Sequence, residues 1–237
     1  MAAQHAWDNV LLSDQLYAEL DDFVMLAQNA GYGVSPNPDG DGHAFALHYN
    51  TTGPDPQPDY DWAAFRGALY NASSRNLIYL GHGGPDGLGH NAANTNRFIR
   101  ATEIANVLHT LPAGQTNRHA YRMVILDGCG TAKGTLPESF GIIHREGVPG
   151  SYYYYASLRQ SAFMGWSSDK YVGFLGAGNP DHIHFIGWIP YFMTQGYGIK
   201  DARDAAGRMD DVNKAYITPS QFTVYGCKDL TFWAFNR

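Results

Sequence analysis

Residues 76–84 read NLIYLGHGG and residues 122–132 read RMVILDGCGTA, and these two stretches determine how the chain folds. Each is a short apolar run that ends in a glycine-rich turn, which is typical of a buried parallel strand followed by a loop. Each turn presents one reactive side chain between glycines, His82 in the first and Cys129 in the second. Because reactive groups of open α/β sheets collect beyond the carboxyl ends of the strands, we expect these two side chains to be neighbours.

Helical and strand patterns alternate around these two runs. Apolar residues recur at helical spacing, or caps mark a helix, over residues 13–30, 62–69, 102–111, 135–145 and 200–213. Further strands are predicted within residues 43–49, at the Tyr-rich residues 152–155, and around Val224 and Phe232, and a helix near Pro190 is expected to be interrupted there. Strands that alternate with helices predict an α/β fold with a mostly parallel central sheet flanked by helices.

The composition indicates one soluble domain over residues 1–237. Hydrophobic residues make up 44% of the chain and charged residues 16%, and no apolar run is long enough to span a membrane. No secretory signal is visible in residues 1–9, so a cytoplasmic location is expected. The net charge of -6 and the scattered basic residues argue against nucleic-acid partners. The two distant cysteines suggest neither a disulfide framework nor a zinc site, and Cys227 is interpreted as structural.

A thiol beside an imidazole is the minimum for acyl transfer, because the thiolate attacks a carbonyl and the imidazole protonates the departing amine. Flanking glycines also let backbone N–H groups approach the developing oxyanion. Other glycine-rich chemistries are excluded, since the chain has no GxGxxG fingerprint at these turns, no GxxxxGK[ST] phosphate loop and no GxSxG elbow. The pattern therefore favours a cysteine-dependent hydrolase.

The two motifs resemble those of the caspase-like superfamily of cysteine peptidases, and they are nearest to its metacaspase, separase, gingipain and CHAT members. The interval from His82 to Cys129 is 47 residues (129 − 82), close to the roughly 50 of caspases. The resemblance covers about residues 60–215 and implies a three-layer caspase-like sandwich with cysteine endopeptidase activity. It assigns His82 as acid/base, Cys129 as nucleophile, and the N–H groups of Gly83 and Cys129 as the oxyanion hole.

The resemblance also implies a substrate preference. Asp127 stands two residues before the nucleophile, where metacaspases and paracaspases pair an Asp with a basic substrate side chain. Cleavage after Arg or Lys is therefore expected, with Arg preferred for its bidentate fork. The segment 161–166 resembles the region that follows the catalytic strand in CHAT and gingipain-like members, and Phe163 and Trp166 are candidates for the walls of the substrate cleft. A turn-capping role for Asp127 and a core position for the two aromatic residues remain alternatives.

Two features concern the first strand and regulation. Members of the family usually begin with a strand, and only residues 7–11 fit one, so the N-terminal strand is expected to be truncated or absent. Many relatives are held inactive until a partner, a cleavage or calcium rearranges a loop, which makes the glycine- and asparagine-rich segment 83–98 a candidate mobile loop. No resident cofactor or metal is expected. The expected partners are a protein or peptide substrate and a regulatory partner or domain.

Alternatives of other classes remain. A catalytically silent caspase-like module that binds partners would keep the fold without the chemistry, and a non-proteolytic hydrolase or transferase would use the same Cys-His pair. His182 and His184 would share a face if residues 181–184 formed a strand, which would allow a metal pair. Ordinary surface or core histidines are the preferred interpretation of these two.

Overall fold

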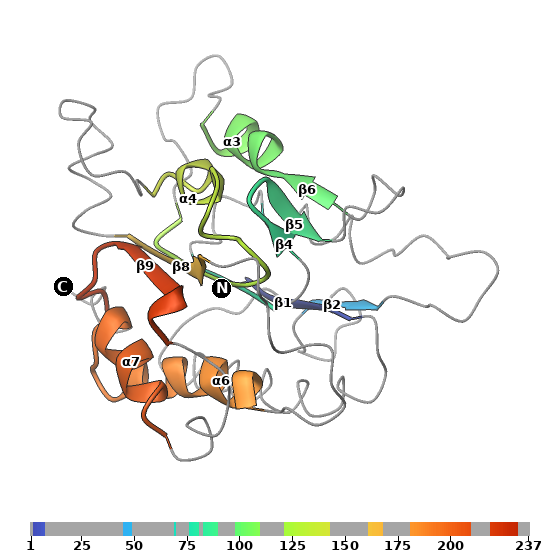
Figure 1. The fold of residues 1–237 in the computed structure, drawn as a ribbon. Helices are drawn as coiled ribbons and strands as arrows, with labels where there is room; N and C mark the ends of the chain where they lie inside the picture. The colour runs from blue at the N-terminus through green and yellow to red at the C-terminus, as the bar shows by residue number, and fades with distance from the viewer. Residues whose placement is uncertain are drawn as a thin grey trace.

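The computed structural model of the 237-residue chain describes residues 2–7, 45–48, 69, 76–80, 83–89, 98–109, 121–142, 161–167, 181–209 and 219–231. For residues 2–7 and 45–48 it describes the backbone alone. These segments form two sheets and the helices that pack on them (Figure 1).

The central sheet has six strands. In spatial order they are β2 (Phe45–His48), β1 (Ala2–Trp7), β3 (Asn76–Leu80), β7 (Met123–Asp127), β8 (Ala162–Trp166) and β9 (Phe222–Gly226). The first five pair in parallel, and β9 pairs antiparallel with β8. The prediction of an α/β fold with a mostly parallel sheet is confirmed. Chain order reverses between β1 and β3, which is the switch point where open α/β sheets form a crevice.

Several strands fall where the sequence places them. β3 and β7 are the apolar runs of the two quoted stretches, β2 lies within the predicted range 43–49, and β9 contains Val224. The expectation that the N-terminal strand is truncated or absent is wrong, because β1 spans Ala2–Trp7 and lies between β2 and β3. The run AAQHAW has weak strand propensity, and pairing on both sides places it in the sheet.

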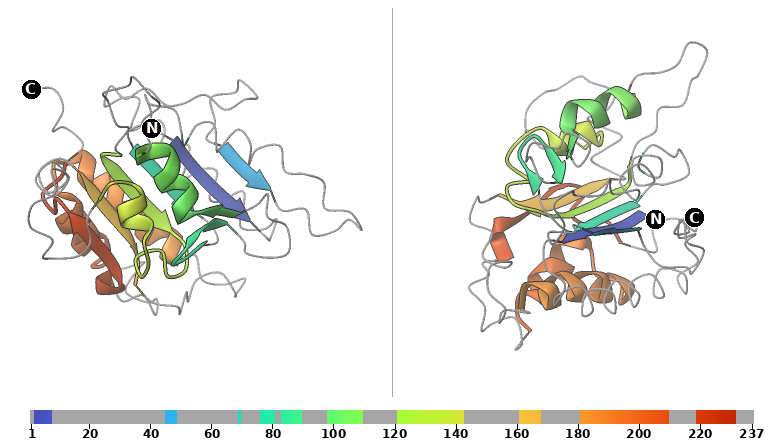
Figure 2. Two further views of the ribbon diagram at one scale, coloured as in Figure 1. Left: turned by 90° about the horizontal axis from the view of Figure 1, so that it is seen from above. Right: turned by 90° about the vertical axis from the view of Figure 1, so that its right-hand side faces the viewer.

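Two apolar cores sandwich the sheet, one on each face. Alternate residues of a strand point to opposite faces, so Val124 and Leu126 pack on one side while Met123 and Ile125 pack on the other. α3 (Ala101–His109) and α4 (Leu136–Ser139) cover the first face, and α6 (Asp181–Thr194) and α7 (Ile199–Ala206) cover the second. The right-hand view of Figure 2 shows the sheet between these two helical layers.

Three helix predictions are corrected. α4 is a single turn that ends at Ser139, because Gly141 adopts φ +79°, and Thr135 forms no side-chain cap. α6 continues through Pro190, since burial of Phe185, Ile189 and Met193 offsets the lost backbone bond, which costs about 3 kcal/mol. α7 ends at Ala206 and is followed by a turn, well before the predicted end at Asn213.

Other predictions concern the edges of the described chain. α3 begins at Ala101, one residue before the predicted start of the helix over residues 102–111. Leu69 is helical, in agreement with the pattern at 62–69. The predicted helix over residues 13–30, the strand at 152–155 and the strand around Phe232 lie outside the described residues. A short 3₁₀ turn, Pro219–Gln221, leads into β9.

A second, three-stranded antiparallel sheet lies above the central one in Figure 1. Its strands are β4 (Gly83–Gly84), β5 (Gly87–Gly89) and β6 (Phe98–Arg100). The candidate mobile loop over 83–98 is corrected in part, because residues 83–89 and Phe98 belong to this sheet. Leu88 and Ile99 are fully buried beneath α3, and the amide of Ala101 donates to the carbonyl of Asp86 at 2.7 Å, which explains why this glycine-rich stretch is held in strands.

None of the helices in the described part of the chain combines the length and the apolar character that crossing a bilayer requires.

Candidate active site

The two motif strands are adjacent and end at the same level. β3 and β7 pair in parallel, and the register sets Leu80 opposite Asp127. In the sequence His82 follows Leu80 by two residues and Cys129 follows Asp127 by two residues, and the ends of β3 and β7 lie at the same edge of the sheet. This edge lies beside the switch point between β1 and β3. His82 itself lies outside the described residues.

Gly83 brings the chain that follows His82 back against the Cys129 turn. A Cβ atom built at Gly83 would lie 2.7 Å from Cγ2 of Thr131 and 3.4 Å from Cα of Gly128. Such a close approach is open only to glycine unless a neighbour moves. Leu80 therefore lies opposite the strand residue that leads into the Cys129 turn, and Gly83 lies against the turn itself.

The turn that carries Cys129 is a compact hydrogen-bonded structure. Gly130 adopts φ +63°, a left-handed conformation that glycine takes without strain. The amide of Lys133 donates to the carbonyl of Gly130 at 2.9 Å, and the amide of Ala132 donates to the carbonyl of Trp166 at 2.9 Å. Cys129 is half-buried. The turn thus presents its thiol from a backbone tied to the end of β8.

Neither cysteine of the chain is in a disulfide, and the structure describes both. Cys227 is also half-buried, and it packs against the core on the α6 and α7 face. Its amide donates to the carbonyl of Ser161 at 2.8 Å. This position, at the end of β9 and against a core, agrees with the structural role predicted for Cys227.

Thr131 connects the turn to its neighbours, and the sequence motifs do not single it out. Its side chain is fully buried, and its Oγ1 lies within hydrogen-bonding distance of two carbonyls as a donor, Gly128 at 2.9 Å and Leu126 at 3.1 Å. The same Oγ1 accepts the amide of Trp166 at 3.3 Å. A threonine hydroxyl in a glycine-rich turn commonly bonds to nearby backbone, and this is the signal that the sequence offers.

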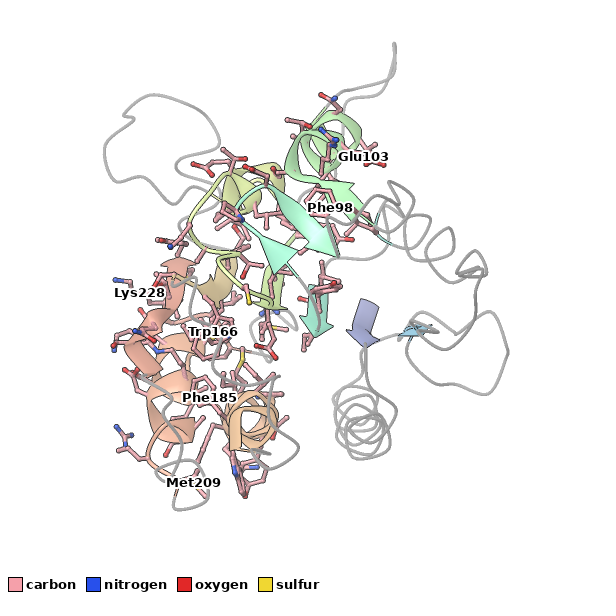
Figure 3. The ribbon with its side chains drawn as sticks, turned by 45° about the vertical axis from the view of Figure 1, so that its right-hand side comes forward. Phe98, Glu103, Trp166, Phe185, Met209 and Lys228 are labelled. Carbon is pink, nitrogen blue, oxygen red and sulfur yellow. The ribbon has the colours of Figure 1, made fainter. Side chains whose placement is uncertain are left out.

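Asp127 is the last residue of β7 and is bonded to Trp166. The indole Nε1 donates to Oδ1 of Asp127 at 2.6 Å, and the two residues are 1% and 5% exposed. Trp166 packs between Phe222, at 4.8 Å between ring centres, and Phe185 of α6, which lies next to it in Figure 3. The carboxylate therefore lies on the α6 face, at the end of the strand that leads into the Cys129 turn, and an aromatic donor engages one of its oxygens.

Phe163 and Trp166 do not line one cleft, although both are candidates for its walls. Trp166 belongs to the core on the α6 side, while Phe163 is fully buried in the core on the α3 and α4 side and contacts Tyr225, with 6.3 Å between ring centres. The odd spacing of three along β8 sends the two side chains to opposite faces. The structure brings Trp166 to Asp127 and keeps Phe163 away from both.

The far side of the Cys129 turn is also supported. The hydroxyl of Tyr225 donates to the carbonyl of Ala132 at 3.2 Å. Burial raises the pKa of Tyr225, and the nearby carboxylate of Glu138 raises it further, so the phenol stays protonated and keeps its donor role at ordinary pH. A Cβ atom at Gly134 would lie 2.1 Å from the carbonyl oxygen of Pro85, so the turn between β4 and β5 packs directly on this loop.

The less favoured alternative of a metal pair required residues 181–184 to form a strand. His182 and His184 belong to α6, where residues two apart lie on opposite sides of the helix, so the strand geometry that would join them is absent. Within the described segments no group of three His, Cys, Asp or Glu side chains could hold a metal ion.

The sequence matches no model of a known protein family and no curated protein. The site itself combines a half-buried thiol on a hydrogen-bonded turn, a glycine strand packed against that turn, and a buried carboxylate at the end of the preceding strand.

Proposed function

We propose that the protein is a cysteine endopeptidase of the caspase-like superfamily, with Cys129 as nucleophile and His82 as acid/base. One observation carries the proposal. Leu80 pairs with Asp127, and Gly83 packs on Gly128, so the chain on both sides of His82 follows the Cys129 turn. Because consecutive Cα atoms lie only about 3.8 Å apart, these two anchors support the proposal that the imidazole of His82 reaches the thiol of Cys129.

The proposed reaction proceeds in two steps. His82 takes the proton of the Cys129 thiol, and the thiolate attacks the scissile carbonyl to form a tetrahedral adduct. His82 then gives its proton to the amine as the C–N bond breaks, which leaves a thioester on Cys129. In the second step His82 deprotonates a water molecule that attacks the thioester, and the acid product leaves as the thiol is restored.

The oxyanion would be held by backbone amides, as the resemblance implies for Gly83 and Cys129. Both residues lie where the strand end and the turn meet, and Gly83 is only half-buried. The tight packing of Gly83 on Gly128 keeps the two backbones in a fixed relation, which is what preorganised donors require. The layered arrangement of helices on both faces of the sheet supports the finer proposal of a caspase-like three-layer sandwich.

The proposed substrate is a peptide with Arg or Lys on the acyl side of the cleaved bond. Asp127 supports this preference, because it holds a buried carboxylate two residues before the nucleophile. A guanidinium would have to reach this group beside the indole that engages Oδ1. Asp127→Asn keeps an oxygen acceptor for Trp166 and removes the charge. We expect Asn to lower kcat/KM for Arg peptides by about tenfold or more and to spare neutral peptides.

The experiment for the peptidase itself is active-site labelling of the full chain. A peptidyl acyloxymethyl ketone ending in Arg should modify Cys129, as read by peptide mass spectrometry, and should leave Cys227 unmodified. Cys129→Ala is the test variant, and Cys227→Ala is the matched control, because it removes the other half-buried thiol. Profiling with a peptide library should show hydrolysis that Cys129→Ala abolishes and Cys227→Ala retains.

Absence of labelling and of hydrolysis under every activating condition tried, calcium included, would refute the peptidase. That result would favour the silent, partner-binding module. Turnover that is equal for acidic and basic residues would refute the substrate preference alone.

A further inference from the structure

The Cys129 turn and the strand that follows His82 meet through one side chain, that of Thr131. Its methyl carbon, Cγ2, occupies the space in front of Gly83, at 2.7 Å from where a Cβ would be. On its other branch, Oγ1 lies 2.7 Å from where a Cβ of Gly165 would be. Thr131 is thus enclosed by two glycines, one from each neighbouring segment.

The orientation of this side chain is determined by its hydrogen bonds. Oγ1 is placed for the carbonyls of Leu126 and Gly128 and also accepts from the amide of Trp166. Rotation about the Cα–Cβ bond would break the hydrogen bonds of the hydroxyl to the Leu126 carbonyl and the Trp166 amide, which is costly in a buried site, although the Gly128 carbonyl would keep the amide of Thr131 at 3.4 Å. The methyl group is therefore held against Gly83 and cannot turn aside at low cost.

We infer that Thr131 is a positioning residue that sets the distance between the Cys129 turn and the chain that follows His82. Its hydroxyl holds the turn to β7 and β8, and its methyl group is the spacer against β4. The importance of Thr131 for catalysis rests on the proposed function, whereas its contact with Gly83 is tested separately. Thr131 touches neither the thiol nor a substrate in this scheme, and it acts through the backbone.

The contact allows a double-mutant cycle with Gly83. Gly83→Ala puts a Cβ into the Thr131 methyl group, and because Thr131 cannot rotate away, we expect β4 to be pushed off the turn. Gly83 has no positive φ, so the substitution carries no backbone strain of its own. Thr131→Ser removes the methyl and keeps the hydroxyl, which opens the space that the added Cβ needs. The control is Gly84→Ala, whose Cβ would have no atom within 4 Å.

Three readouts are measured on the full chain: the rate of Cys129 labelling by the peptidyl ketone, the pH midpoint of Cys129 alkylation by iodoacetamide, and the thermal midpoint. Gly83→Ala should slow labelling by about tenfold or more, since small displacements of reacting groups cost this much. It should also move the alkylation midpoint toward the value near 8.5 of an ordinary thiol. Thr131→Ser should slow labelling by less than about threefold, and the double variant should return to the Thr131→Ser values.

The outcomes separate the inference from the function. If the double variant is no better than Gly83→Ala in labelling and in the pH midpoint, the positioning role is refuted. If only the thermal midpoint shows the rescue, Thr131 is structural and the inference fails. If wild type shows neither labelling nor hydrolysis under any activating condition, the peptidase fails, while the alkylation midpoints of wild type, the two single variants and the double variant still decide the role of Thr131.

Discussion

The bond between Trp166 and Asp127 leads to a stability prediction whose size follows from the observed contacts. Trp166→Phe removes the indole N–H that donates to Oδ1 at 2.6 Å and leaves the carboxylate, 1% exposed, without that donor. A hydrogen bond to a charged group contributes about 1.5–3 kcal/mol. The smaller ring also loses packing on Phe185 and Phe222, which the lost apolar area puts at about 1–2 kcal/mol.

We therefore expect Trp166→Phe to lower the free energy of unfolding by about 2.5–5 kcal/mol. The matched control is Asp127→Asn, which keeps an oxygen for the indole and all of the ring packing, and should cost about 1 kcal/mol. The assay is urea unfolding at pH 7 followed by far-UV circular dichroism, with equal m-values required for the comparison. If Trp166→Phe lowered the free energy of unfolding by less than Asp127→Asn, this expectation would be wrong, because the hydrogen bond to Asp127 would then add no stability.

Two further predictions concern the loop packing and a surface ion pair. Gly134→Ala should lower the free energy of unfolding by about 1–3 kcal/mol, because its Cβ would lie 2.1 Å from the Pro85 carbonyl oxygen. Gly84→Ala is the control, since its Cβ would have no atom within 4 Å, and equal urea midpoints for the two variants would contradict the prediction. At Asp204, burial raises the pKa, but hydrogen bonds from Lys200 and Arg203 outweigh it and leave the pKa below its usual value. Because the pKa of Asp204 is lower in the folded than in the unfolded chain, its contribution to stability is present above the unfolded-state pKa and is lost as the pH falls through the folded-state pKa. Asp204→Asn should therefore cost under about 1 kcal/mol at pH 6 and nothing near pH 2. A cost that persists at pH 2 would count against the ion pair as its source.

Local sequence patterns are sufficient to predict a strand or helix where the composition of the segment agrees with its place in the fold. β3 and β7 are continuous apolar runs, which favour buried strands. α3 has apolar residues at helical spacing, which favour an amphipathic helix. Their predicted positions are close to those observed. The glycine turns after β3 and β7 are likewise local features, and they are enough to single out Cys129 as a candidate nucleophile.

Predictions fail where distant partners decide the structure. Residues 2–7 have weak strand propensity, yet β1 lies between two partners; residues 83–89 look like a flexible loop, yet burial of Leu88 beneath α3 holds them as strands. Pro190 should interrupt a helix, yet the buried face of α6 carries it through. In each case long-range packing contributes more free energy than the local preference.

Consecutive residues were enough to specify the strand-and-turn motifs and the mostly parallel α/β class, because short-range periodicity and turn chemistry are local properties. They also single out Cys129 as a candidate nucleophile. Three relations emerged only from the folded chain: Leu80 lies opposite Asp127, Trp166 and Phe163 face opposite sides of the sheet, and Thr131 fills the space before Gly83. Register and packing depend on which surfaces meet across tens of residues, and no local pattern carries that information.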